Sequence, residues 1–143
     1  MTLSLDSWLL WALLSAIFAA LTAILAKIGI ENVNSDFATF IRTIVILLAA
    51  GGIVVATGHW QAPETVSAKT WTFLVLSGLA TGASWICYFR ALKLGQAAQV
   101  APIDKLSVVL VAVFAAVFLG ERMALHSWLG IALIAGGAIL VAI

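Results

Sequence analysis

Long apolar stretches, separated by short polar connections, fill almost the whole of the 143-residue chain. Each stretch is close to the ~20 residues that an α-helix needs to cross about 30 Å of hydrocarbon. The pattern therefore predicts five transmembrane helices in a single domain over residues 1–143, with no soluble domain between them. The five predicted spans are residues 8–27, 37–57, 71–89, 99–119 and 126–143.

Other fold classes do not fit this pattern. A soluble helical core would carry polar residues on an outward face, but the only polar side chain in Leu106–Leu119 is Ser107. Strands of a membrane barrel would alternate apolar and polar positions, and these stretches do not alternate. Composition agrees, because only 9% of the residues are charged, against roughly 25% in a soluble domain. We expect an all-α polytopic membrane protein.

Polar and aromatic residues indicate where the helices end. Ser35 or Asp36 is expected to cap the second helix. Pro102 is expected within the first turn of the fourth helix, where a missing N–H does little harm. Trp85 is the one tryptophan placed deep inside a span, whereas the others fall at span ends, as an aromatic belt would place them. The tryptophans at span ends are Trp8, Trp11, Trp60, Trp71 and Trp128.

Pairs of glycines lie within several of the spans, and two of these pairs are candidates for close packing. Gly78 and Gly82 form a GxxxG pair in the third span, and Gly136 and Gly137 are adjacent in the fifth. Small residues at such positions let two helix backbones approach closely in lipid. Packing within the chain is the favoured interpretation, and a face for dimerisation is the alternative.

The distribution of basic residues predicts an orientation. The side of the membrane that receives the first and third connections and the C-terminus has five lysines and arginines near it, and the other side has Lys69 and Arg122. The positive-inside rule then predicts an external N-terminus and a cytoplasmic C-terminus. If Arg42 and Lys105 do not count because they lie inside helices, the bias falls to three against two, so insertion in both orientations stays open. The five basic residues are Lys27, Arg42, Arg90, Lys93 and Lys105.

Three charged residues lie well inside the predicted spans, away from their ends: Arg42, Asp104 and Lys105. Each is about six residues from the start of its helix, roughly 8–9 Å deep, and both helices start on the same side. Intramembrane charges are costly and usually face a cavity or a partner. One interpretation is a polar substrate site. The other is a structural Arg42–Asp104 pair, with Lys105 extending its ammonium to the headgroups.

Enzyme, metal and nucleic-acid functions have no support in the sequence. The single cysteine, Cys87, excludes a disulfide framework and a cysteine metal site, and we expect it to be a small buried apolar residue. His59 and His126 are too far apart in sequence to suggest a metal pair. No nucleophile–base arrangement, phosphate loop or zinc motif is present. The lysines and arginines are scattered, so no nucleic-acid surface is expected, and no cofactor is predicted.

Several short motifs, in this order and spacing, carry a resemblance to a known family. They are Tyr88–Gly95 (YFRALKLG), Val100–Ile103 (VAPI), Leu119–Arg122 (LGER) and Trp128–Gly137 (WLGIALIAGG). The chain resembles an EamA-type repeat of the drug/metabolite transporter superfamily from about Trp8 to Val141. The usual member has ten spans, made of two such repeats in opposite orientation. The resemblance therefore implies that two five-helix units assemble, as an inverted homodimer or with a related five-span partner.

The resemblance also implies a function. Inverted repeats place a substrate site near the midplane and give alternating access by rocking, so we expect a transporter of small metabolites or drugs in a bacterial inner membrane. Asp104 is the candidate for proton coupling. Arg42 is the candidate to hold an anionic substrate group or to pair with Asp104, and Lys105 and Trp85 complete the candidate set.

One departure and one alternative qualify this expectation. The first helix has no acidic residue between Trp8 and Ala26. It thus lacks the embedded glutamate of the four-span small multidrug resistance relatives, and their antiport of cationic drugs is not implied. The alternative function is a non-transporting membrane subunit that packs against a partner complex in the bilayer.

Overall fold

The computed structural model describes residues 8–143, and helices are the only regular structure in that range. Five helical segments there are long and apolar enough to cross a membrane. The all-α fold class with five transmembrane helices is thereby confirmed. The spans are α1 (Trp8–Gly29), α2 (Ser35–Ala56), α3 (Ala68–Leu94), a fourth span Ala97–Phe118 made of two helices, and α6 (Leu125–Ala142).

The described residues fall into two compact units. Unit 1 contains the described part of Met1–Leu25 together with Leu94–Ile143, and unit 2 is Ala26–Lys93. The end of α1 therefore belongs to unit 2, along with α2 and nearly all of α3. That the whole chain forms a single domain remains a prediction.

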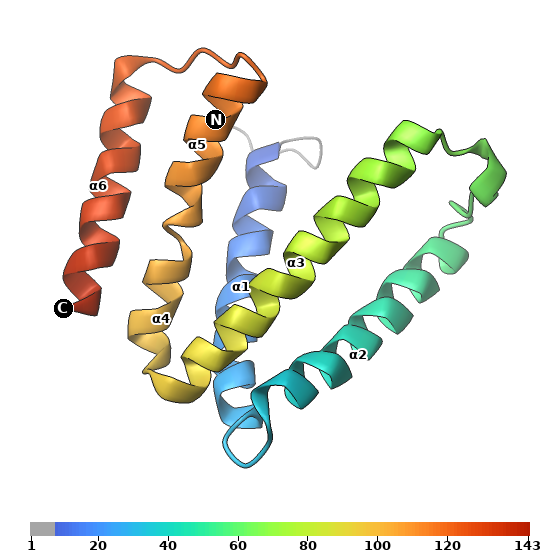
Figure 1. The fold of residues 1–143 in the computed structure, drawn as a ribbon, viewed down its shortest axis with the longest axis horizontal. Coiled ribbons are helices and arrows are strands. Elements are labelled where there is room, and N and C mark those ends of the chain that lie inside the picture. The colour runs from blue at the N-terminus through green and yellow to red at the C-terminus, as the bar shows by residue number, and fades with distance from the viewer. Residues whose placement is uncertain (1–7) are drawn as a thin grey trace. The chain divides into compact units, whose positions relative to one another are not determined.

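In unit 1, α6 packs against both halves of the fourth span (Figure 1). These halves are α4 (Ala97–Asp104) and α5 (Ser107–Phe118). The buried residues of α5 and α6 are Ala112 and Ala138. Small side chains at buried positions allow helices to pack closely in lipid.

The fourth span is broken, although the sequence pattern predicted one continuous helix over 99–119. The helix begins at Ala97, so Pro102 lies inside α4 and not in its first turn. Proline there removes one helical hydrogen bond, and its ring clashes with the carbonyl four residues earlier. At the break, amides bond to carbonyls three residues earlier, whereas in an α-helix they bond to carbonyls four residues earlier. The Leu106 amide donates to the Ile103 carbonyl and the Val108 amide to the Lys105 carbonyl, each at 3.0 Å.

In unit 2, Asn34 caps α2, and neither Ser35 nor Asp36 does. Its backbone is extended, and its side chain accepts hydrogen bonds from the amides of Asp36 at 2.9 Å and Phe37 at 3.2 Å. Ser35 is already helical, so its side chain cannot reach these amides in the way that an N-cap residue does. The sequence prediction was wrong by one residue.

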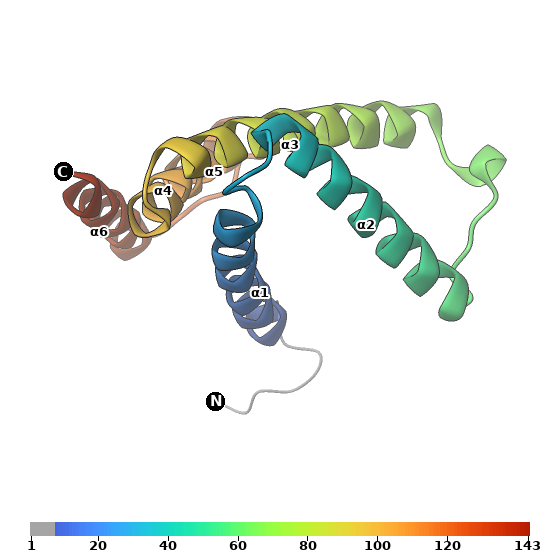
Figure 2. The same ribbon diagram turned by 90° about the horizontal axis from the view of Figure 1, so that it is seen from below.

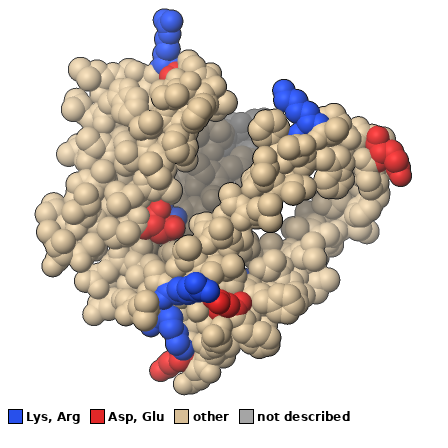
Figure 3. All heavy atoms as spheres, viewed as in Figure 1, with Lys and Arg blue, Asp and Glu red and all other residues tan. Residues whose placement is uncertain are grey.

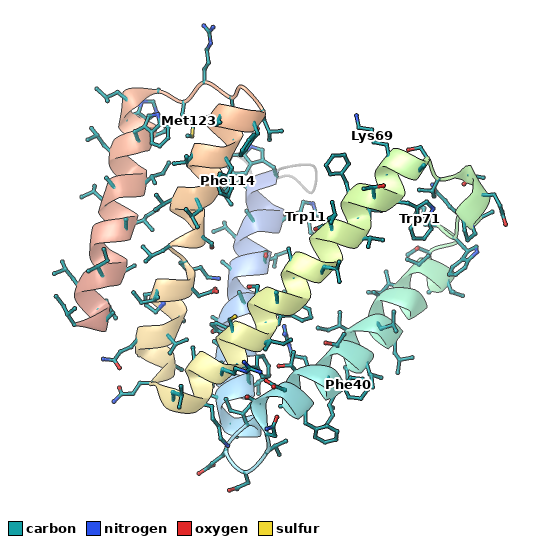
Figure 4. All side chains as sticks on the ribbon, in the orientation of Figure 1. Trp11, Phe40, Lys69, Trp71, Phe114 and Met123 are labelled. Atoms are coloured by element: carbon teal, nitrogen blue, oxygen red, sulfur yellow. The ribbon has the colours of Figure 1, made fainter. Side chains whose placement is uncertain are left out.

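Helices α2 and α3 meet where α2 begins and α3 ends, and they separate toward the connection that contains the short helix η1 (Pro63–Thr65) (Figures 1 and 2). The tryptophan at the wide end, Trp71, donates from Nε1 to the Pro63 carbonyl at 3.4 Å and lies beside that connection (Figure 4). The buried residues of unit 2 belong to the narrow end. They are Ala26, Ile30, Thr39, Phe89 and Leu92.

Most large apolar side chains of the described residues remain exposed, as expected of helices that face lipid. Leu47, Leu79 and Leu133 are each more than 60% exposed, and charged groups are sparse on the face seen in Figure 3. Cys87 is also exposed. The expectation that it would be buried was therefore wrong for the described residues.

The glycines singled out in the sequence have open surroundings. A Cβ added to Gly78 or Gly82 on α3, or to Gly136 or Gly137 on α6, would meet no atom within 4 Å. No contact within either unit therefore depends on the missing side chain. Their role in packing or dimerisation remains a prediction.

Candidate substrate and coupling site

Arg42 lies over two aromatic rings of α3. Its guanidinium carbon is 4.1 Å from the centre of the Trp85 ring and 5.4 Å from that of Phe89. Trp85 and Phe89 are four residues apart and so share one face of α3. We call the two rings the aromatic platform. Phe89 is only 2% exposed, so packing holds its ring in place. A cation over an aromatic face is attracted by the ring quadrupole, and more strongly where water is excluded.

The acid nearest to Arg42 in sequence, Asp36, is paired with another arginine. Arg90 donates from Nε to Oδ1 of Asp36 at 2.9 Å and from Nη2 to Oδ2 at 2.7 Å. Two parallel bonds of this kind match the planar fork of arginine to a carboxylate. Blue and red side chains accordingly lie together where α2 begins and α3 ends (Figure 3). The pair joins the start of α2 to the end of α3.

Two lysines connect the ends of α1 and α3 reciprocally. Lys93, in the last turn of α3, donates to the carbonyls of Ile30, Glu31 and Val33, the latter two at 2.7 and 3.1 Å. Lys27, in the last turn of α1, donates to the Leu92 carbonyl at 2.6 Å. Cations are favourable at helix C-termini, and the three bonds use all three donors of the Lys93 ammonium.

We call Lys27 and Lys93, with the carbonyls that they bind, the lysine clamp. A half-open cavity of about 390 Å³ lies beside it. Its lining combines both ammonium-bearing side chains with Ile28, Ile30 and Glu31. The three donors of the Lys93 ammonium already bind carbonyl oxygens. This ammonium therefore has no donor left for a ligand in the cavity.

Asp104 and Lys105 lie at the break in the fourth span. Asp104 is the last residue of α4, and its Oδ2 accepts from the Lys105 ammonium at 3.1 Å. Their side chains are 34% and 55% exposed, respectively. The pair therefore combines opposite charges with an irregular backbone.

The candidate residues predicted from the sequence thus form two local groups, Arg42 with Trp85 and Asp104 with Lys105. Arg42 belongs to unit 2 and Asp104 to unit 1, and the Arg42–Asp104 pair remains a prediction. Sequence reasoning missed Phe89, which is an ordinary apolar residue of the span. It also missed the Asp36–Arg90 pair, whose signal was present: opposite charges at two helix ends that the topology brings to one side.

Comparison with known proteins places the chain in a family. The family model described as "EamA-like transporter family" matches residues 6–143. The chain belongs to the EamA-like transporter family. The resemblance predicted from the sequence motifs is confirmed. No solved structure matches the chain significantly.

Two EamA-like relatives differ in length. An "Uncharacterized transporter in cobO 3'region" of Sinorhizobium sp. is 64% identical over 138 residues, which are 96% of this chain and 98% of the relative. An "Uncharacterized transporter YxxF" of Bacillus subtilis (strain 168) is 30% identical over 138 residues, again 96% of this chain but 43% of the relative. This chain thus spans nearly all of one relative and less than half of the other.

Family membership and the five spans establish the general role. The protein is an integral membrane protein of the EamA-like family with a general transporter role. Members of this family are generally not enzymes, and both relatives are named transporters.

Proposed function

We propose that the chain is one repeat of a small-metabolite transporter that works by alternating access as a dimer of five-helix units. The observation that carries the proposal is the pair of relatives. One has the length of this chain, whereas in the other the matched residues are 43% of the whole. A longer chain of that size has room for a second unit, which a second copy or a related five-span partner supplies here.

The broken fourth span supports a transport function. Discontinuous transmembrane helices commonly form substrate and ion sites in transporters, because their irregular backbone is tolerated only where it lines a cavity or is buried in protein. In this chain an acid, Asp104, lies at the break. We assign it the coupling role, in which its carboxylate takes up and releases a proton during the cycle.

The open glycine faces support assembly. A Cβ added at Gly78 or Gly82 would meet nothing within 4 Å, so a partner helix has room to approach α3 there. We assign this face to the contact between two units, with Gly136 and Gly137 on α6 as a second candidate. The dimer is inverted if the two copies insert in opposite orientations.

Transport is tested with purified protein in liposomes, screened over amino acids, organic cations and metabolites, with and without a pH gradient. The proposal predicts saturable flux of at least one class, driven by the pH gradient. Binding of solutes without any flux, together with co-purification of a larger membrane complex, would instead favour a non-transporting subunit.

Assembly and orientation need separate measurements. Native mass spectrometry from lipid should show a dimer, and full transport by a demonstrated monomer would overturn this part of the proposal. For orientation, single cysteines at Asn32 and Ala62, in a Cys87→Ser background, are labelled in intact cells. An external N-terminus predicts labelling of Ala62→Cys only, whereas comparable labelling of both positions would show dual topology in the inner membrane.

A further inference from the structure

The Arg42 guanidinium does not extend toward the membrane surface. Arg42 is six residues beyond Asp36 on α2, and Trp85 is five residues before Arg90 on α3. At 1.5 Å per residue these steps correspond to about 9 and 7.5 Å, so Arg42 and Trp85 lie at the same level, inside the Asp36–Arg90 pair. A snorkelling side chain would point to the end of α3. The guanidinium carbon is instead nearer to the deeper ring, Trp85, than to Phe89.

Arg42 has no carboxylate partner within the described residues of unit 2. Asp36 is held by both oxygens on Arg90, and the only other ion pair formed among residues 8–143 is that of Asp104 with Lys105. A cation in a membrane span requires a counter-charge. The two rings stabilise the guanidinium, but no acid among the described residues of unit 2 compensates its charge.

The rings contact the face of the guanidinium, and Tyr88 of α3 also interacts with it electrostatically. An aromatic ring meets the guanidinium through the π face, whereas the five N–H donors lie at its edge, in a fork that fits a carboxylate. Because Phe89 is almost fully buried, its ring is held in place before any ligand binds. A preorganised site loses less entropy on binding than a mobile one.

We infer that Arg42, held over Trp85 and Phe89, is the binding site for the carboxylate of a small monoanionic organic substrate. One positive charge is balanced by one negative charge, whereas a phosphate dianion would leave an excess charge in a region of low dielectric. The inference rests on the proposed transport function, because the bound carboxylate is a substrate only if the protein transports it. Binding at Arg42 itself can be tested without transport.

The test uses three probes that share one ring. Benzoate carries a carboxylate, benzylamine an ammonium and benzamide no charge. Phenylglyoxal, which modifies accessible guanidinium groups, is applied to the wild-type protein in phosphatidylcholine vesicles, and each arginine is followed by mass spectrometry. Benzoate should slow modification of Arg42, while benzylamine and benzamide should not. Arg122, in the connection before α6, is the internal control and should be modified equally in all cases.

Binding affinity gives a second measurement. Arg42→Gln should weaken benzoate binding about ten- to a hundredfold, the usual effect of losing charge-assisted hydrogen bonds. Arg42→Lys retains the charge and is the second variant to test if the glutamine variant does not fold. It should bind benzoate several-fold more weakly, because a lysine cannot form the two-pronged contact. Arg122→Gln, the matched control, should bind as the wild type does.

Several outcomes would overturn the inference. They are equal protection by benzamide, tighter binding of phenyl phosphate than of benzoate, and protection by phosphatidylglycerol in the absence of any probe, which would assign Arg42 to a lipid headgroup. Modification of Arg42 only after Asp104→Asn would show that Asp104 occupies the guanidinium. The proposed transport function and the Arg42 site can fail independently. Flux of cations alone would leave the transport function intact and refute the carboxylate site. Protection of Arg42 by benzoate without flux of any solute would support the site and refute the transport function.

Discussion

Arg42 and Asp104 are both ionisable residues well inside membrane spans, and the chain surrounds them in opposite ways. Arg42 has a rigid aromatic support and no acid beside it in unit 2. Asp104 has a cation 3.1 Å away but lies where the backbone leaves α-helical geometry. A charge on a fixed support without a counter-charge suits the binding of an ion. A carboxylate compensated by its neighbour at a helix break suits a change of protonation state. This difference is why we propose substrate binding for Arg42 and coupling for Asp104.

The largest effect is expected at Asp104. Asp104→Asn cannot release a proton, so transport driven by a pH gradient should be lost, while exchange of substrate across the membrane without a gradient should persist. Flux in liposomes measures both. If Arg42 and Asp104 instead form a structural pair, each single neutralisation strands a charge and costs several kcal/mol. The folding yield would then fall in Asp104→Asn and in Arg42→Gln and recover in the double variant.

The second effect concerns assembly. Leucines at Gly78 and Gly82 should strongly weaken the dimer if α3 contacts its partner there, because the larger side chains keep the helix backbones apart. We expect little destabilisation of the single chain, since a Cβ added at either position has no neighbour within 4 Å. Dimer dissociation in lipid, followed by energy transfer between labelled copies, measures the effect. Ala80→Leu, on the other side of α3, is the matched control. An unchanged dimer would assign the contact elsewhere, with Gly136 and Gly137 next to test.

The third effect tests whether the helix break matters for the cycle. Pro102→Ala restores an amide donor and removes the ring clash, which together cost a helix interior about 3 kcal/mol. We expect slower amide hydrogen exchange around residues 105–108 and several-fold slower transport, with substrate binding unchanged. Pro63→Ala in η1 is the control. Faster exchange in Pro102→Ala, or unchanged flux with a repaired helix, would separate the break from the transport cycle.

The sequence predicted the parts of the fold that depend on apolar length. All five spans were predicted. The break in the fourth span was missed through a small error at its start. With the helix expected from Gln99, Pro102 fell in a harmless first turn, whereas a start at Ala97 places it in the interior. Helix boundaries are the least reliable feature of such predictions.

The contacts of the candidate site were harder to predict than its residues. Arg42 and Trp85 were chosen separately because each is unusual in a membrane span, and nothing in the sequence gives the rotation that brings them together. The lysine clamp leaves even less trace, because Lys93 binds backbone carbonyls, which every residue has. The Asp36–Arg90 pair was within reach, since both residues lie at helix ends on the same predicted side.

The fourth prediction addresses that clamp. Lys93→Met keeps the length of the side chain but removes three hydrogen bonds to the connection between α1 and α2. Hydrogen bonds from a charged donor contribute about 1.5–3 kcal/mol, and a loss in that range is expected in the free energy of unfolding, measured in mixed micelles titrated with dodecyl sulfate. Lys69→Met, at the opposite end of α3, should have little effect. Equal losses in both variants would show that the clamp contributes nothing beyond a lysine at a helix end.

The smallest effect is expected for the exposed pair that connects the same two helices. Arg90 and Asp36 have excellent geometry, but their side chains are 60% and 47% exposed, respectively, and exposed ion pairs contribute little. Asp36→Asn and Arg90→Gln should each destabilise the protein less than Lys93→Met, and the double variant should be no worse than either single change. The position of Arg42 gives the pair a second readout. If the pair only joins the helices, benzoate should protect Arg42 equally in all three variants. If neutralising Arg90 frees Asp36 to reach Arg42, one turn and a half further along α2, protection by benzoate should fall in Arg90→Gln and return in the double variant. That pattern would show that Arg90 keeps the binding cation available by occupying the acid that would otherwise neutralise it.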